Sequence, residues 1–396
     1  MKNILFITWD GPQTTYMEGL FMPIYQAVKA KSNYKFHVIQ FTWGSSERIK
    51  VTAQKAAALG IKYTVIKIHR KPVAILGSFI TLYKGTYLLN KYIAENNIDI
   101  VMPRSTMPSV MVNRLNKGNF QVLFDADGLP LEERVDFSGL TRTSKQYLFF
   151  KKEETKMLQQ ANGVITRSQK SIDIHLKTIH HKNPEKFSVV LNGRNTDFFK
   201  PNDEAKIKFR KELNIKASSK VFVYCGSLGA QYGWDEMITI FQKYQQKHTD
   251  AFFLILTGNI EFALQRIPTE LSESILVKKV PFEEVPKYLN IADVAFAIRE
   301  PKFSMQGVAP IKLGEYLLMG IPTIASVGIG DSEEIMKQVP NAFLFHHDNP
   351  NAIDEALLFV ENLSDVNHQK IRESGIEYFS IEKSAESYIA ALNKLK

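Results

Sequence analysis

The chain has 396 residues, of which 44% are hydrophobic and 23% are charged. This composition, over a length that suits two or three domains, excludes a long disordered chain, a collagen-like repeat and a coiled coil. The single cysteine, Cys225, excludes an internal disulfide framework and a cysteine-rich zinc module. The net charge of +9 is unevenly spread: residues 1–195 hold 28 Lys and Arg against 14 Asp and Glu, and residues 196–396 hold 22 against 27.

A basic first half beside a mildly acidic second half indicates two surfaces with different partners. Anionic lipid, a phosphorylated substrate and nucleic acid are candidates for the basic half, and a solvated surface without a ligand is the alternative. No signature of a nucleic-acid-binding module occurs, so we expect no nucleic-acid partner. Residues 73–89 form the most membrane-like stretch, but they fall short of the ~20 apolar residues of a membrane span and include Lys84. The first apolar run is too short for a signal peptide. We therefore expect a cytoplasmic protein, peripheral at most on the inner face of the plasma membrane.

Short apolar runs alternate with helix-like stretches along the whole chain, and this alternation predicts βαβ units with mainly parallel sheets. The first series of predicted strands covers residues 4–8, 35–41, 63–68, 100–103, 121–125 and 163–166. The second series covers residues 188–191, 220–224, 251–257, 275–278, 294–298, 323–326 and 342–345. Helix-like stretches include residues 16–31 and 234–249, and residues 192–203 carry the turn residues of a linker. Two doubly wound α/β domains follow, with ligands expected beyond the carboxyl ends of the strands.

The segment Asp125-Ala126-Asp127 ends a strand of the first series. A D-x-D pair can hold a divalent metal on a nucleotide-sugar, but this short pattern is common by chance. A strand-end carboxylate that serves as acceptor ligand or general base is the more plausible function. A turn at Asp127 with Asp125 as its cap is the structural alternative.

Lysines and aromatic residues are interleaved in residues 67–92 and again in residues 142–160. Such segments can form a patch that binds a membrane surface. The commoner explanation is a buried helix whose lysines extend along apolar neighbours to reach water.

A glycine-rich turn, residues 225–233, lies between a predicted strand and a predicted helix. Backbone N–H groups at such a turn can bind an anion. The spacing matches neither the dinucleotide-binding fingerprint nor the Walker P-loop, and a tight turn without a ligand is the alternative.

Residues 307–322 form the most informative stretch. Lys312 and Glu315 are three residues apart on a predicted helix and therefore share one face. The lysine can neutralise a phosphate, and the carboxylate can accept hydrogen bonds from two vicinal hydroxyls, as on a ribose. A surface ion pair worth a few tenths of a kcal/mol is the alternative.

With these residues described, the chain resembles a family 4 glycosyltransferase of the GT-B type, most clearly from about residue 164 to the C-terminus. The resemblance rests on four segments that occur in the family's order. They are the interdomain segment (residues 189–201), the phosphate-binding turn (221–233), the segment beside the nucleotide base (280–297) and the helix with the ribose-binding glutamate (310–326). It implies a GT-B fold in which two doubly wound Rossmann-like domains face each other across a cleft. Residues 1–195 would bind the acceptor, residues 196–376 would bind the nucleotide-sugar, and residues 377–396 would form a helix that crosses back to the first domain.

The resemblance also assigns roles by position. Lys312 and the turn would hold the donor diphosphate, Glu315 would bind the ribose, and the segment around residues 280–283 would contact the base. The implied donor-binding residues are Gly226, Ser227, Leu228, Gly229, Val280, Phe282, Gly307, Ala309, Pro310, Ile311, Lys312 and Glu315. The implied acceptor-binding residues are Gly11, Gln13, Thr14, Asp125 and Asp127, with Asp127 and Lys312 as catalytic residues.

Members of this family are generally retaining and independent of metal. The resemblance therefore implies no metal site and no cofactor beyond a UDP- or GDP-sugar as the donor substrate. The implied partner is a glycan or lipid-linked saccharide acceptor in cell-surface polysaccharide assembly, with an anionic membrane surface available to the basic half.

Several positions depart from the family pattern. Ser227 and Tyr232 stand where many members have Arg and Lys, so Lys312, Arg299 or Arg194 would have to supply positive charge. Gly307 replaces the first glutamate of the family's glutamate pair, and the loop after the first strand lacks the usual paired glycines. A nucleotide-sugar epimerase and a non-catalytic nucleotide-sugar-binding protein are therefore alternatives.

Overall fold

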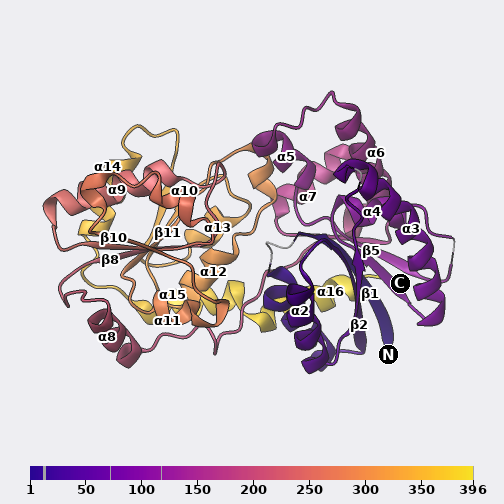
Figure 1. Cartoon of the computed structure of the whole chain (residues 1–396), viewed down its shortest axis with the longest axis horizontal. Coiled ribbons are helices and arrows are strands. Elements are labelled where there is room, and N and C mark those ends of the chain that lie inside the picture. The colour runs from indigo at the N-terminus through magenta and orange to yellow at the C-terminus, as the bar shows by residue number, and fades with distance from the viewer. Residues whose placement is uncertain (12–14, 72, 117, 396) are drawn as a thin grey trace. The chain divides into compact units, whose positions relative to one another are not determined.

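The computed structural model describes residues 1–11, 15–71, 73–116 and 118–395, and its contacts divide the chain into two units (Figure 1). Unit 1 comprises residues 1–192 together with the C-terminal residues from 381 onward, and unit 2 comprises Gly193–Ser380. The boundaries predicted from the sequence follow residues 195 and 376, whereas the contacts place them after residues 192 and 380.

Unit 1 is built on a parallel seven-stranded sheet in the order β3-β2-β1-β4-β5-β6-β7. The strands are β1 (Lys2–Asp10), β2 (Tyr34–Thr42), β3 (Lys62–Lys67), β4 (Ile100–Pro103), β5 (Gln121–Asp125), β6 (Gly163–Thr166) and β7 (Phe187–Val189). The strand order reverses direction at β1, which makes the sheet doubly wound. The carboxyl ends of β1 and β4 therefore flank the topological switch point.

Helices connect these strands. They are α1 (Met22–Lys31), α2 (Ser46–Ala58), α3 (Ala74–Glu95), α4 (Thr106–Val112), α5 (Pro130–Ser138), α6 (Lys145–Gln160), α7 (Gln169–Thr178) and α16 (Ile381–Asn393), with a π-helix at Met17–Phe21 and a 3-10 turn at Pro184–Lys186. Helix α4 packs against α3 and α6, and α16 packs against α1. The last helix of the chain thus completes the core of unit 1, where Tyr388 lies edge-on to Tyr25.

Unit 2 is built on a parallel six-stranded sheet in the order β10-β9-β8-β11-β12-β13. The strands are β8 (Val221–Cys225), β9 (Phe252–Leu256), β10 (Ile275–Lys278), β11 (Val294–Ala297), β12 (Thr323–Ser326) and β13 (Ala342–Phe345). Its helices are α8 (Asp203–Glu212), α9 (Trp234–Lys247), α10 (Ile260–Leu264), α11 (Val285–Leu289), α12 (Ile311–Leu318), α13 (Ser332–Met336), α14 (Ala352–Glu361) and α15 (His368–Phe379), with 3-10 turns at Thr269–Leu271, Phe282–Glu284 and Phe303–Gly307. The order reverses at β8, so β8 and β11 flank the second switch point.

Burial on both faces explains why these strands appear as continuous apolar runs in the sequence. In β8, Val221 and Val223 pack into one hydrophobic layer, and Phe222 and Tyr224 pack into the other. The expectation of two doubly wound α/β domains is confirmed. One strand differs, because residues 187–189 pair with β6 and close the edge of the first sheet rather than opening the second series.

Candidate functional site

A glycine-rich turn follows β8 at the switch point of unit 2. Gly226 and Gly229 have φ angles of 146° and 151°, a backbone conformation that side chains with a Cβ rarely adopt. A Cβ on Gly226 would lie 2.9 Å from Nζ of Lys312, whereas a Cβ on Gly229 would meet no atom within 4 Å. The turn therefore needs glycine at Gly226 both for its backbone and for its close approach to this lysine.

Lys312 lies in the first turn of α12 and is 7% exposed. Its ammonium donates a hydrogen bond to the Tyr224 hydroxyl at 2.5 Å and lies 4.0 Å and 4.3 Å from the ring centres of Tyr224 and Tyr232. Burial lowers the pKa of Lys312 well below its usual value, and the nearby Arg299 guanidinium lowers it further. A bound anion would oppose both effects, because it favours the charged form of the lysine.

Arg299 follows β11 and lies on the other side of the switch point. Its guanidinium is 4.8 Å from the ring centre of Tyr232, and the backbone of Tyr232 forms a β-bridge with that of Arg299. Tyr232 thus contacts both Arg299 and Lys312. Within the described ranges, no carboxylate lies within 4.0 Å of either cation. The site thus holds two buried or half-buried cations beside a glycine turn, and no carboxylate neutralises them. This arrangement is suited to binding a diphosphate.

Glu315 lies one turn after Lys312 and is also buried. Its Oε1 accepts a hydrogen bond from Nε of Arg194 at 2.8 Å. Burial raises the pKa of Glu315, although the Arg194 charge opposes the rise. The Arg194 guanidinium in turn lies 5.6 Å from the ring centre of Phe282, so the predicted ribose and base residues are held together. Arg194 is therefore committed to Glu315, and Arg299 is the cation that accompanies Lys312.

The other predicted donor residues lie on loops that lead into these elements. Val280 is in the loop after β10, and Gly307 ends the 3-10 turn that precedes α12. Ala309 and Pro310 lead into α12, and Ile311 is its first residue. Two further predicted residues lie in the glycine turn: Ser227 is exposed and Leu228 is buried. The backbone N–H of Leu228 donates to Asn259 Oδ1 at 3.0 Å, so this amide is already satisfied by the protein. The structure thus brings the turn together with Lys312, and Phe282 together with Glu315.

The thiol of Cys225, at the end of β8, is not suited to nucleophilic chemistry. Burial raises its pKa to about 12, and its backbone N–H donates to the Tyr316 hydroxyl at 2.7 Å.

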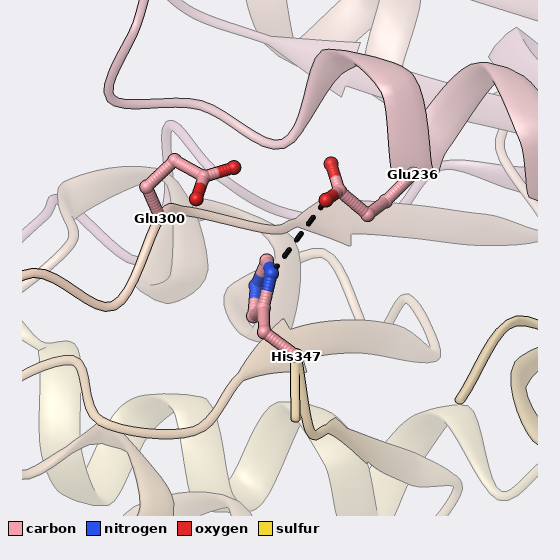
Figure 2. Close-up of side chains that lie close together, drawn as sticks. All are labelled: Glu236, Glu300 and His347. Atoms are coloured by element: carbon pink, nitrogen blue, oxygen red, sulfur yellow. Dashed lines mark ion pairs between the residues drawn. The ribbon is translucent and has the colours of Figure 1, made fainter. Parts of the chain in front are cut away.

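A second group of polar side chains lies at the carboxyl edge of the same sheet and was not predicted. The group comprises Glu236 from the first turn of α9, Glu300 from the loop after β11 and His347 after β13 (Figure 2). One nitrogen or oxygen atom from each side chain lies within 4.8 Å of the other two. His347 Nδ1 is 3.6 Å from Glu236, and its Nε2 is 2.9 Å from Ser326 Oγ. The neighbouring His347 imidazole lowers the pKa of Glu236. Glu300 and His347 each lie within three residues after the end of a strand, and that placement is the signal that could have indicated them.

A cavity of about 510 Å³ adjoins this group. Glu300 and His347 line it together with Lys302 and Asp348. The cavity extends beyond the carboxyl ends of β11, β12 and β13, the edge where open parallel sheets bind ligands.

In unit 1, the predicted carboxylates lie at the carboxyl end of β5, where Asp125 is the last residue of the strand and Asp127 follows it. Asp125 is fully buried, and its Oδ2 accepts a hydrogen bond from Arg167 at 2.8 Å. Its Oδ1 accepts from the backbone N–H of Asp127, so Asp125 does cap the turn. Asp127 has a φ of 61°, keeps 27% of its side chain exposed and accepts a hydrogen bond from Arg104 at 2.5 Å. Of the two, only Asp127 is placed to contact a solute directly.

The predicted loop after β1 is described only in part. Gly11 lies close to Trp43, because a Cβ on this glycine would be 2.8 Å from an atom of the indole ring. Gln13 and Thr14 lie outside the described residues.

The comparisons with known proteins agree with this geometry. Residues 205–377 match the family described as "Glycosyl transferases group 1". Most of unit 2 is therefore similar to this family. A curated relative, "Uncharacterized glycosyltransferase MJ1607" from Methanocaldococcus jannaschii, is 25% identical over 197 residues. The match covers 48% of this chain and 48% of the relative, so the chain spans about half the length of that protein.

Two solved structures cover nearly the whole chain. The crystal structure of Anabaena Alr3699/HepE in complex with UDP matches at a TM-score of 0.72 with 14% identity, covering 100% of both chains. That of WaaG, "a glycosyltransferase involved in lipopolysaccharide biosynthesis", matches at a TM-score of 0.68 with 14% identity, covering 97% of this chain and 98% of WaaG. These likenesses confirm the GT-B fold. Among the described residues, no helix combines the length and the apolar character needed to cross a bilayer.

Proposed function

We propose that the protein transfers a sugar from a nucleotide-sugar to a glycan or lipid-linked saccharide in cell-surface polysaccharide assembly. The observation that carries this proposal is the pair of unneutralised cations, Lys312 and Arg299, around Tyr232 beside the glycine turn of a unit similar to the group 1 glycosyltransferases. A nucleoside diphosphate supplies the anion that this pair lacks. The UDP complex of the Anabaena relative supports a UDP-sugar as the first donor to test.

The proposed reaction breaks the bond between the anomeric carbon and the donor phosphate oxygen, and it forms a bond between that carbon and the oxygen of the acceptor hydroxyl. Negative charge then develops on the leaving nucleoside diphosphate, where Lys312 and Arg299 stabilise it. Glu315, held by Arg194, accepts hydrogen bonds from the ribose hydroxyls. We propose that the leaving phosphate takes the proton of the acceptor hydroxyl, so that attack occurs on the same face with retention and without a metal ion. Asp127, whose carboxylate is partly exposed, orients the acceptor hydroxyl.

We also propose that unit 1 binds the acceptor at an anionic membrane surface. Residues 1–195 carry 14 more basic than acidic residues. Each Lys or Arg that lies near an anionic membrane surface contributes about 1 kcal/mol to the binding free energy. Peripheral attachment to the inner face of the plasma membrane would bring unit 1 to a lipid-linked acceptor.

The test is release of nucleoside diphosphate from UDP- and GDP-sugars by the protein with saccharide acceptors, in EDTA and in Mg²⁺. The proposal expects turnover of one nucleotide series, unaffected by EDTA, with the new glycosidic bond in the donor's anomeric configuration. Lys312→Ala should lower kcat/KM, because it removes about 2–4 kcal/mol of transition-state stabilisation.

The outcomes separate the alternatives. Isomerisation of a free nucleotide-sugar without an acceptor product would identify an epimerase. Binding of a nucleotide-sugar without any turnover would identify a binding protein and overturn the proposed transfer.

A further inference from the structure

A second cavity, of about 570 Å³, lies in unit 1 beyond the ends of β1, β2 and β3 and under α3 and α6. Its volume is within the range of small-molecule sites, roughly 300–1,000 Å³. Its walls are mainly aromatic and aliphatic. The apolar side chains that define it are Trp9, Trp43, Phe79, Leu82, Phe149 and Phe150.

Three cations also line this cavity: Arg70, Arg134 and Lys145. No acidic residue is among its lining residues, and within the described residues none of the three cations has a carboxylate within 4.0 Å. The Arg70 guanidinium lies 5.1 Å from the ring centre of Trp43, where a ring face and a positive charge attract each other. The cavity therefore combines apolar walls with positive charge that no carboxylate in its lining neutralises.

The outer face of α3 continues the apolar character of the cavity. Phe79 lines the cavity and is also 46% exposed. Its ring lies edge-on to that of Phe149 in α6, with 6.0 Å between the two ring centres. Ile80, Tyr83 and Tyr87 are exposed at helical spacing along the same helix, with Tyr83 at 83%. These residues share one face of α3, because positions three, four and seven apart lie on the same side of a helix.

We propose that this cavity binds the lipid end of the acceptor, a phosphate or diphosphate ester of a long apolar chain. A purely apolar ligand would leave three cations unneutralised, and a purely anionic one would leave the aromatic walls exposed to water. A concave site fits one molecule rather than a flat bilayer, and the rest of its chain can continue over the apolar face of α3. This inference rests on the proposed function, since it names the chemistry of the acceptor.

The test uses tryptophan fluorescence, because two of the three tryptophans of the chain, Trp9 and Trp43, line the cavity. Farnesyl phosphate, farnesol, inorganic phosphate and anionic phospholipid vesicles are titrated separately without nucleotide, the two farnesyl compounds below any micelle-forming concentration. We expect a saturable change with farnesyl phosphate, and binding of farnesol or phosphate weaker by at least about tenfold, or 1.4 kcal/mol. Trp43→Phe should reduce the signal, and Trp234→Phe, in unit 2, should leave its midpoint unchanged.

Charge variants test the role of the cations. Arg70→Gln with Lys145→Gln should remove the preference for farnesyl phosphate over farnesol. Lys84→Gln with Lys91→Gln removes the same charge from α3 outside the cavity lining and should leave the preference intact. Equal binding of farnesol and farnesyl phosphate, an unchanged preference in the first variant, or a response only to anionic phospholipid vesicles would each overturn the proposal.

The result is independent of the donor site. Failure of nucleotide-sugar turnover with intact farnesyl phosphate binding would refute the proposed function alone. Turnover without farnesyl phosphate binding would refute this inference alone.

Discussion

At the scale of single residues, the central feature is a lysine whose charge the free protein does not favour. Lys312 is buried beside another cation, so its folded-state pKa is lower than its unfolded one. At a pH below both values, the charged lysine reduces the stability of the free protein. As the pH rises from the folded to the unfolded pKa, the unfolded state binds more protons and the free energy of unfolding increases.

Lys312→Met should therefore stabilise the unliganded protein, by up to about 2 kcal/mol, because it replaces a buried charge by an apolar side chain of similar length. The same variant should lose binding of UDP and GDP. Denaturant unfolding and calorimetric titration check the two effects, with Lys216→Met on the exposed surface as the control. A variant that is strongly destabilised but still binds nucleotide would contradict this account of Lys312.

Nucleotide binding should also be accompanied by proton uptake. A bound diphosphate raises the pKa of Lys312 above its value in the free protein, so the lysine takes up a proton at a pH between the two values. Calorimetry at a series of pH values, in buffers of different ionisation enthalpy, measures this uptake. Uptake that persists unchanged in Lys312→Met would assign the proton to another group.

At the scale of secondary-structure elements, the strand-to-helix turn after β8 positions the charged groups. Its two glycines provide a matched pair for testing, because both have positive φ but only Gly226 lies against Lys312. A substitution at either position strains the backbone by about 1–3 kcal/mol. Only the substitution at Gly226 also displaces the lysine.

Gly226→Ala should weaken nucleotide binding by about tenfold or more, whereas Gly229→Ala should mainly lower the melting temperature through backbone strain of about 1 kcal/mol or more. Calorimetric titration and thermal unfolding of both variants separate affinity from stability. Equal losses of affinity in the two variants would show that the contact with Lys312 is unimportant.

The elements themselves were largely predictable from the sequence, and the side-chain contacts were less so. Buried parallel strands form apolar runs, so β8 and β11 could be located, and the residues after them could be named as site candidates. The contact of Tyr232 with both Lys312 and Arg299 joins segments far apart in sequence, and only the folded chain brings them together. For the same reason the sequence could not show that Arg167 forms a hydrogen bond with Asp125, or that Trp9, Trp43 and Phe79 line one cavity.

At the scale of the whole molecule, the chain returns to its first unit. Ala385, Tyr388 and Leu392 of α16 are buried, and Ser384 Oγ donates to the backbone carbonyl of Leu191 at 2.6 Å. The core of unit 1 is therefore incomplete without the last helix. By contrast, every residue that we assign to the donor site belongs to unit 2.

In a chain that ends at Ser380, the backbone amides of unit 1 should lose protection from hydrogen exchange, whereas those of unit 2 should keep it. Removal of α16 uncovers apolar side chains, each of which contributes roughly 1.5–3 kcal/mol when fully buried. Hydrogen exchange of the truncated and full-length chains measures this, with nucleotide binding as the readout for unit 2. Loss of protection mainly within β8–β13 would contradict the division into units.

The most direct test of the central claim is calorimetric titration of the full chain with UDP- and GDP-sugars in the presence of EDTA. Glu315→Gln is titrated alongside, with Glu204→Gln on the exposed start of α8 as the matched control. We predict that one nucleotide series binds without metal, that binding is lost in Glu315→Gln, and that it is retained in Glu204→Gln. Absence of binding by every nucleotide-sugar, or equal binding by both variants, would contradict the assignment of the donor site.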